Sequence, residues 1–349
     1  MVKKLGLLTS GGDCPGLNAV IRAVVRRSLT DYGAEVVGIL RGWRGLMDGL
    51  MQPLNHDAVS GILPRGGTIL RTSRTNPFVH ERGAERILEN VRRAGLEAVI
   101  AVGGDDTMGV AYRLYREYGL PVVGVPKTID NDVVGTDFTF GFDTTVNIAM
   151  EAIDRIHTTA ESHDRVVVVE VMGRDTGWIA LYAGLAGGAD MIIVPERPVS
   201  VQEVCDLIRH RHDRGKDFSI VVVAEGARLI LHDGREVQAL QEDEYDEFGH
   251  GRRGGIGETL GREIEAETGY ETRVTVLGHV QRGGTPSAFD RILGTRFGIA
   301  AADFVQQGKF GHMVAIRGDT IVAVDLAQVA GKLKTVTDDY YNLARPFFG

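Results

Sequence analysis

The sequence predicts an α/β protein built from mainly parallel sheets with helices on both faces. Short apolar runs of the buried-strand type alternate with helical patterns along most of the 349 residues. Glycine is abundant at 46 residues, which is typical of tight strand-to-helix turns and of backbone that approaches a ligand closely. A chain of this length predicts roughly two domains.

Each expected strand is a short apolar run of the strand type. These runs are Leu5–Thr9, Val36–Leu40, Ala98–Val102, Val122–Val125, Val166–Val171, Met191–Val194 and Ile220–Ala224. The expected helices are Leu17–Ser28, Ala84–Ala94, Thr107–Tyr118, Thr144–Ser162, Val201–Asp213 and Ile256–Thr268. An acidic segment at Gln241–Glu247 interrupts the pattern and is predicted to be a solvated loop.

Composition excludes several classes of protein. The net charge is −8 and no basic stripe is visible, so we expect no nucleic-acid partner. Two cysteines, Cys14 and Cys205, cannot form a disulfide framework in so long a chain and predict reduced, intracellular thiols. No apolar run reaches the about 18 residues of a membrane helix. We therefore expect a soluble, cytoplasmic protein with no membrane partner.

A glycine pair, Gly11 and Gly12, directly follows the first expected strand. Backbone N–H groups there, together with the positive end of the next helix, would suit a phosphate. The alternative is a plain strand-to-helix turn.

A second pair, Gly103 and Gly104, follows another strand and precedes Asp105 and Asp106. Glycine backbone and carboxylates at the carboxyl end of a strand would suit an anionic ligand and a hard cation such as Mg²⁺. The alternative is a solvated acidic turn.

The segment after the next strand contains Lys127, Thr128, Asp130 and Asp132. A carboxylate in a structured loop is a natural general base, and a lysine is a natural phosphate ligand. The alternative is a turn rich in Asp and Asn with a surface lysine. All three motifs follow strands, and open α/β sheets bind ligands at that edge.

The C-terminal half supplies cationic side chains, namely Arg165, Arg174, Arg273, His279 and Arg282. Arg273 and His279 flank a β-run, so we expect both to face one side and to bind a second anionic group. A solvated charge is the alternative for any one of these residues.

Together these motifs predict phosphoryl transfer, whose catalysis depends mainly on positioning and charge neutralisation. A second cationic site implies that the acceptor also carries a phosphate. Glu225, at the end of another apolar run, would accept hydrogen bonds from sugar hydroxyls.

Five segments resemble 6-phosphofructokinases and occur in the order of that family along nearly the whole chain: Thr9–Asn18, Gly103–Thr107, Pro126–Asp132, Met172–Arg174 and Gly278–Gly284. The resemblance implies two three-layer αβα domains. Residues 1–141 and 281–331 would bind the phosphoryl donor, and residues 142–280 and 332–349 would bind the sugar phosphate. The implied reaction phosphorylates fructose 6-phosphate at its 1-hydroxyl with Mg²⁺.

The resemblance also implies roles for single residues. Asp130 matches the general base, Asp105 the Mg²⁺ ligand, and Thr128 and Arg174 the groups that steady the transferring phosphoryl. The donor would be held by Gly11, Gly12, Arg74, Gly104, Asp106 and Lys127. The sugar phosphate would be bound by Thr128, Asp130, Asp132, Met172, Gly173, Arg174, Glu225, His279 and Arg282. Arg165 and Arg273 match arginines that reach a neighbouring subunit's active site, which implies a homodimer or homotetramer.

Two departures from the family pattern concern the donor. ATP-using members carry glycine at the positions of Asp106 and usually of Lys127. A carboxylate at 106 would put negative charge where the α-phosphate of ATP lies, and a lysine at 127 suits a compact pyrophosphate. Both changes resemble the pyrophosphate-dependent branch, whose reaction is typically reversible, so pyrophosphate is the expected donor.

Three alternatives remain open at this stage. One is an ATP-dependent phosphofructokinase that tolerates both substitutions. Another is a different kinase with the Gly-Gly-Asp-x-Thr loop, although such kinases lack the Pro126–Asp132 element. The third is a non-catalytic phosphosugar sensor, which would be expected to have lost Asp105 or Asp130.

Overall fold

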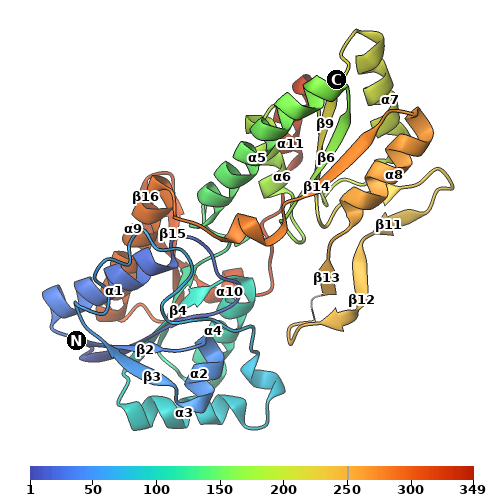
Figure 1. Cartoon of the computed structure of the whole chain (residues 1–349). Helices are drawn as coiled ribbons and strands as arrows, with labels where there is room; N and C mark the ends of the chain where they lie inside the picture. Colours follow the sequence, from blue (N-terminus) through green and yellow to red (C-terminus); the bar gives the residue numbers. More distant parts are fainter. Residues whose placement is uncertain (250) are drawn as a thin grey trace. The chain divides into compact units, whose positions relative to one another are not determined.

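The computed structural model describes residues 1–249 and 251–349. The chain divides into two compact units (Figure 1). Unit 1 comprises Met1–Thr144, Asp246–His250 and Arg282–Leu333, and unit 2 comprises Thr145–Tyr245, Gly251–Gln281 and Lys334–Gly349. The membership of Asp246–His250 in unit 1 is not predicted by the sequence.

Unit 1 is built on a seven-stranded sheet in the order β16-β15-β5-β4-β1-β2-β3. Its strands are β1 (Lys4–Thr9), β2 (Glu35–Ile39), β3 (Met51–Leu54), β4 (Ala98–Gly103), β5 (Val122–Pro126), β15 (His312–Arg317) and β16 (Thr320–Asp325). The strands from β2 to β15 are parallel, and the two edge strands are antiparallel to their neighbours. The central strands are buried on both faces, as parallel sheets require.

Helices cover both faces of this sheet (Figure 1). One face carries α1 (Leu17–Tyr32) packed against α9 (Ala288–Gln306). The other face carries α2 (Gly42–Asp48), α3 (Gly83–Ala94), α4 (Asp105–Tyr118) and α10 (Leu326–Val329), with a short 3₁₀ turn, η1 (Pro77–Val79).

Unit 2 contains a four-stranded parallel sheet in the order β14-β6-β9-β7. The strands are β6 (Val166–Val171), β7 (Met191–Ile193), β9 (Ser219–Ala224) and β14 (Thr272–Val276). One face packs on α7 (Val201–Asp213) and α8 (Ile256–Thr268). The remaining helices are α5 (Phe142–His163), α6 (Trp178–Ala186), α11 (Asp338–Ala344), η2 (Gly278–Arg282) and η3 (Arg345–Phe347).

Short strands complete unit 2. A three-stranded sheet joins β11 (Glu236–Gln238), β10 (Arg228–Ile230) and β8 (Val199–Ser200). A separate antiparallel pair joins β12 (Leu240–Tyr245) and β13 (Gly251–Arg253). The expected solvated loop at Gln241–Glu247 is therefore wrong for Gln241–Tyr245, which lie in a strand; the side chains of residues 240–245 lie outside the description.

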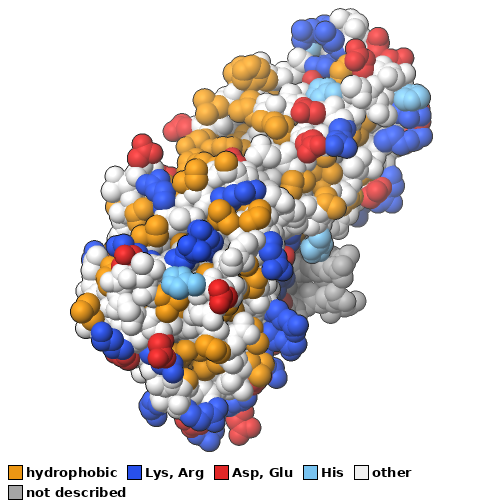
Figure 2. All heavy atoms as spheres, turned by 60° about the vertical axis from the view of Figure 1, so that its left-hand side comes forward, with side chains coloured by type: hydrophobic (Ala, Val, Ile, Leu, Met, Phe, Trp, Pro, Cys, Tyr) orange, Lys and Arg blue, Asp and Glu red, His pale blue; other side chains and the backbone are white. Residues whose placement is uncertain are grey.

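The predicted α/β class with parallel sheets is confirmed. In the described part of the chain no helix is long and apolar enough to cross a membrane. On the face shown in Figure 2, charged side chains of both signs are interspersed with apolar ones.

Candidate active site

The carboxyl ends of β1, β4 and β5 bring the three predicted motifs together in unit 1. After β1 the chain adds β2 on one side and later β4 on the other, and such a switch point is the usual ligand site of an open α/β sheet. The Ser10 N–H donates to the Val102 carbonyl at 2.9 Å, and the Lys127 N–H donates to the Gly103 carbonyl at 2.9 Å. The residues that follow β1 and β5 are thus each hydrogen-bonded to the carboxyl end of β4.

The Gly11–Gly12 turn is tightly packed. Gly11 has φ +82°, and its N–H donates to the Ser73 carbonyl at 3.0 Å. The expectation that the Gly11 N–H is available to a phosphate is therefore wrong. The Gly12 carbonyl accepts a hydrogen bond from Lys127 Nζ, and a Cβ on Gly12 would lie 2.7 Å from Arg282 Nη1. A side chain at position 12 would therefore force the Arg282 guanidinium to shift.

The two acidic residues of the second motif lie in the first turn of α4. The helix begins at Asp105, with Gly104 as its N-cap, rather than at the expected Thr107. Both Asp105 and Asp106 are half-buried. The positive end of the helix stabilises carboxylates in this position, which explains why adjacent acids are tolerated.

The third motif is a buried loop, not the surface turn considered above. Lys127 is only 3% exposed. Thr128 Oγ1 accepts a hydrogen bond from the Asp130 N–H at 3.0 Å. Asn131 adopts φ +52°, and its Oδ1 accepts from the Thr139 N–H at 3.1 Å. These contacts order the loop that carries Asp130.

Carboxylates crowd this end of the sheet. Burial raises the pKa of Asp132 to about 8, and the negative charges of Asp130 and Asp105 add to the effect. Asp132 is 5% exposed, and within the described chain its Oδ1 has no hydrogen-bond partner. A divalent cation would satisfy this oxygen and offset the repulsion among the carboxylates.

The described residues fit Mg²⁺ in one particular way. Among the side chains that the structure describes, no three from acidic, histidine or cysteine residues form a complete metal-binding group. Mg²⁺ commonly takes one or two protein carboxylates together with waters and substrate phosphates. Asp105 and Asp132 supply carboxylates of that kind.

Two other buried groups lie in the same region. Burial lowers the pKa of Lys127, because a charged ammonium group is penalised away from water. Burial also raises the pKa of the Cys14 thiol well above its usual range. A thiol of this kind does not form the thiolate that a nucleophile needs.

In unit 2, the loop after β6 lies beside the loop after β9. Gly173 has φ +141°, and a Cβ there would lie 2.5 Å from the Thr176 carbonyl oxygen. The Arg174 N–H donates to Glu225 Oε1 at 3.0 Å. The Met172 N–H donates to Gln281 Oε1 at 3.4 Å. The carboxyl ends of the strands of unit 2 thus bring together the predicted residues Met172, Gly173, Arg174 and Glu225.

Arg165 and Arg273 lie at the other end of these strands, near their amino ends. Arg165 directly precedes β6, and Arg273 is the second residue of β14, paired with Val167. Both guanidinium groups bind Glu271, with Arg165 Nη2 at 2.8 Å from its Oε1. His279 lies in η2, beyond the carboxyl end of β14. Arg273 lies near the start of β14 and His279 beyond its end, so the expectation that both bind one anionic group stays a prediction.

The remaining predicted cations lie in unit 1. Arg282 Nη1 donates to the Asp13 carbonyl at 3.3 Å, beside the glycine turn after β1. Arg74 is exposed, with Nη1 3.7 Å from Asp246 Oδ2. His279 belongs to unit 2, so the two residues predicted to bind the sugar's phosphate come from different units.

A protein-family model described as "Phosphofructokinase" matches residues 4–305, which is most of the chain. The chain belongs to the phosphofructokinase family. The resemblance of the five sequence segments to that family is thereby confirmed.

Similar proteins include members with each type of donor. The chain is 58% identical to the pyrophosphate–fructose 6-phosphate 1-phosphotransferase of Streptomyces coelicolor over 346 residues, covering 99% of this chain and 100% of the relative. It is 52% identical to the ATP-dependent 6-phosphofructokinase 3 of the same organism over 338 residues, covering 97% and 98% of the two chains.

Solved structures have the same fold. A phosphofructokinase from Saccharomyces cerevisiae gives a TM-score of 0.80 at 33% identity, with 93% of this chain and 45% of that chain covered. The chain thus spans less than half of that longer phosphofructokinase. A pyrophosphate-dependent phosphofructokinase from Marinobacter aquaeolei gives a TM-score of 0.81 at 23% identity, covering 100% and 92% of the two chains.

Some buried polar residues of this phosphofructokinase are not predicted from the sequence. Gln281 is fully buried, and its backbone carbonyl accepts from Thr145 Oγ1 at 2.8 Å. Glu170 accepts from the Gly255 and Gly257 N–H groups at the start of α8. Neither partner is near in sequence, so no local pattern indicates these contacts.

A local sequence pattern, by contrast, indicates the position of Asp290 at the start of a helix. Ser287 Oγ caps α9 by accepting from the Asp290 N–H at 3.2 Å. A serine followed three residues later by an acidic residue is a known pattern for the start of a helix.

Proposed function

We propose that this phosphofructokinase transfers a phosphoryl group reversibly between pyrophosphate and the 1-hydroxyl of fructose 6-phosphate. The products in the forward direction are fructose 1,6-bisphosphate and phosphate. The observation that carries the proposal is the position of Lys127, whose buried Nζ reaches the Gly12 carbonyl and lies 3.4 Å from where a Cβ of Gly11 would be. A single ammonium group in so confined a space matches a small, highly charged donor.

The proton of the 1-hydroxyl would be accepted by Asp130. Thr128 Oγ1 accepts from the Asp130 backbone and donates to its Oδ2 at 3.4 Å. The carboxylate is therefore oriented by its own loop and needs little reorganisation when the acceptor sugar binds. A positioned base of this kind contributes rate by removing the proton as the new P–O bond forms.

Asp105 and Asp132 would hold Mg²⁺. The ion supplies charge neutralisation for the phosphoryl oxygens when it is bound. The chain's own share of that work falls to Lys127, Arg174 and Arg74, whose positive charges would accompany the donor. Because two neighbouring carboxylates repel that of Asp132, cation binding would also stabilise the loop.

Asp106 would act against nucleoside triphosphates. It lies beside Asp105 in the first turn of α4, so its carboxylate would add negative charge beside the donor. ATP has a further phosphate to place near that charge, whereas pyrophosphate does not.

The sugar phosphate would be held by residues of unit 2 and by Arg282. Met172, Gly173 and Glu225 would contact the sugar, and His279 and Arg282 its 6-phosphate. Arg165 and Arg273 cannot join them within one subunit, because β6, six residues long, separates the two edges of the sheet by about 20 Å. They would instead reach the active site of a neighbouring copy, so we propose a homo-oligomer.

The proposal is tested by assaying the purified protein in both directions, with pyrophosphate against ATP and phosphate against ADP. We expect turnover with pyrophosphate and phosphate. Turnover with ATP and none with pyrophosphate would refute it and support the second candidate, an ATP-dependent phosphofructokinase, which the 52% identical Streptomyces relative favours. The double variant Asp106→Gly with Lys127→Gly should weaken pyrophosphate use.

A further inference from the structure

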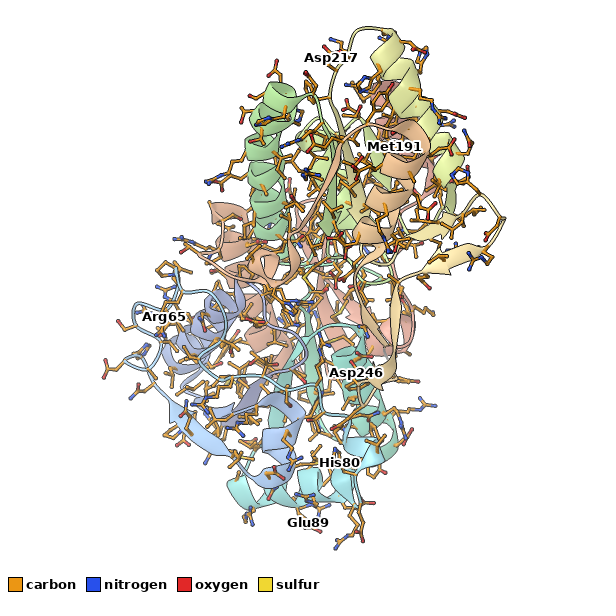
Figure 3. All side chains as sticks on the ribbon, turned by 45° about the vertical axis from the view of Figure 1, so that its right-hand side comes forward. Arg65, His80, Glu89, Met191, Asp217 and Asp246 are labelled. Atoms are coloured by element: carbon orange, nitrogen blue, oxygen red, sulfur yellow. The ribbon has the colours of Figure 1, made fainter. Side chains whose placement is uncertain are left out.

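The connection between β5 and α5 passes the proposed base twice. Its first part, Lys127–Asp132, carries Asp130, and we call it the base loop. β5 ends directly before this loop, and in Figure 3 the blue-green ribbon of β4 and β5 runs through the middle of unit 1, between the labelled residues Arg65 and Asp246. The chain later returns, and Phe140 forms a parallel backbone bridge with Lys127. The residues just before Phe140 therefore lie beside the base loop.

Thr139 is the residue through which the returning chain holds the base loop. It is fully buried. Its Oγ1 donates to the Thr128 carbonyl at 2.9 Å, and its N–H donates to Asn131 Oδ1 at 3.1 Å. Because these two contacts lie on either side of Asp130 in the sequence, one threonine holds the loop both before and after the base.

Thr128 carries this constraint to the base itself. Its carbonyl accepts from Thr139, and its Oγ1 accepts from the Asp130 N–H at 3.0 Å. The peptide group of Asp130 is thus connected to Thr139 through a single residue.

The base loop depends on such contacts because part of its backbone is strained. Asn131, directly after the base, has φ +52°, a left-handed conformation that costs energy for residues other than glycine. Asn131 is 2% exposed, so water cannot readily replace the hydrogen bond that its Oδ1 accepts from Thr139. Residues in such conformations persist where the surrounding structure holds them, and they cluster at functional sites.

The returning segment is itself anchored on the sheet of unit 1. Thr136 Oγ1 accepts from the Ile316 N–H of β15 at 3.0 Å, and the Asp137 N–H donates to the Ile316 carbonyl at 2.9 Å. Thr136 and Thr139 are both buried, but the hydroxyl of Thr136 contacts β15 whereas that of Thr139 contacts the base loop. Thr139 is therefore held by a segment that is fixed to the sheet.

We propose that Thr139 is a positioning residue for phosphoryl transfer, which holds the base loop so that the Asp130 carboxylate meets the 1-hydroxyl of the acceptor sugar. Thr139 acts through Thr128 and Asn131 and does not itself contact a substrate. A displacement of about 1 Å at a reacting group costs about 10²-fold in rate, so the loss of one hydroxyl here should have a large effect. The inference rests on the proposed function, in which Asp130 is the base.

Thr139→Val tests the inference, because valine keeps the shape of the side chain and removes the hydroxyl. We expect kcat with pyrophosphate to fall at least about tenfold, while the KM for fructose 6-phosphate changes by less than about twofold. Thr139→Ser restores the hydroxyl and should keep kcat within about threefold of the wild type.

A double-variant experiment separates positioning from a purely structural role. If Thr139 acts through the base, Thr139→Val should lower kcat by less than about twofold when it is introduced into Asp130→Asn, because residues that act as a unit are not additive. A role in packing alone would lower kcat by the same factor in both backgrounds.

Thr136→Val is the matched control, because it removes a buried hydroxyl from the same segment at the contact with β15. Thermal unfolding verifies that each variant is folded, and Thr136→Val should keep kcat within about twofold of the wild type. If Thr139→Val does not fold, Asn131→Gly removes the other contact without backbone strain, and its kcat should fall in the same way.

Wild-type kcat in the folded Thr139→Val, an equal loss in Thr136→Val, or an additive loss in the Asp130→Asn background would overturn the inference. Full activity of Asp130→Asn would instead overturn the assignment of the base, and exclusive use of ATP by the wild type would overturn the proposed donor.

Discussion

Asp130 combines burial with a fixed orientation, and this combination makes it the most informative single residue of the site. Asp130→Asn keeps the shape of the side chain and a hydrogen-bond acceptor but removes the base. We expect kcat to fall by about 10² to 10⁴, the usual share of a general base, with little change in the binding of fructose 6-phosphate. Steady-state kinetics and sugar-phosphate binding measured on the same preparation check both parts.

Asp137 provides the control for that substitution. It lies on the same connection but is exposed, and its Oδ2 accepts from the Gly318 N–H at 2.7 Å. Asp137→Asn should leave kcat within about twofold. Full activity in Asp130→Asn, or an equal loss in Asp137→Asn, would contradict the role of Asp130.

At the scale of elements, Asp290 joins the start of α9 to the start of α5. It is fully buried, and its Oδ2 accepts from the Thr144 N–H at 2.8 Å and from Thr144 Oγ1 at 2.5 Å. Burial raises the pKa of Asp290 to about 6, although these hydrogen bonds act in the opposite direction and lower it. The carboxyl group thus stays protonated in the folded protein at a pH where it ionises in the unfolded chain.

This raised pKa predicts a pH dependence of stability. Between about pH 4 and pH 6 the folded state binds the extra proton, so its contribution to the free energy of unfolding falls as pH rises. Asp290→Asn cannot ionise, so the stability of this variant relative to wild type should increase by about 2 to 3 kcal/mol over that interval and then stay constant. Urea unfolding at several pH values measures the difference, and a flat difference from pH 4 to pH 7 would contradict it.

Local patterns in the sequence were sufficient for several elements of unit 2. β6, α7 and α8 have the expected bounds, because buried strands and amphipathic helices carry their own periodicity. The start of α4 was expected two residues late, since Asp105 and Asp106 look like loop residues until they are placed at the positive end of a helix.

Contacts between distant stretches could not be predicted in the same way. Gln281 meets Met172 across 109 positions, and Arg165 reaches Glu271 only because β6 and β14 are neighbours. The β-run between Arg273 and His279 was expected, but the ion pair that joins Arg165 to Glu271 was not. The sequence likewise did not indicate that Asp246–Phe248 belong to unit 1, because their acidic residues fit a solvated loop equally well.

At the scale of the whole molecule, we expect neighbouring subunits to share active sites, because Arg165 and Arg273 lie at the end of the unit 2 strands away from Arg174 and Glu225. An Asp130→Asn subunit lacks the base but keeps its arginines, whereas an Arg165→Ala, Arg273→Ala subunit has the opposite defect. If the arginines serve a neighbouring site, co-refolding the two inactive variants should restore activity to about a quarter of the wild-type value. This figure assumes that the subunits pair at random into dimers and that the two active sites of a dimer work independently.

The control pairs Asp130→Asn with Arg174→Ala. Arg174 lies at the same sheet edge as Met172 and Glu225, so its defect belongs to the same subunit's site, and mixing should restore nothing. Equal recovery in both mixtures, or none in either, would show that Arg165 and Arg273 do not act across subunits.

The order of strands in unit 1 also has a consequence for synthesis on the ribosome. β15 pairs with β5, yet all of unit 2 except its final stretch, Lys334–Gly349, is translated between these two strands. Until residue 312 emerges, β5 is an apolar edge strand with no partner on that side, and such an edge can pair with other chains. The segment Thr145–Gln281 can meanwhile form the whole four-stranded sheet of unit 2. The nascent chain should therefore complete its second sheet before its first, and chaperones that cover strand edges would be needed chiefly at β5.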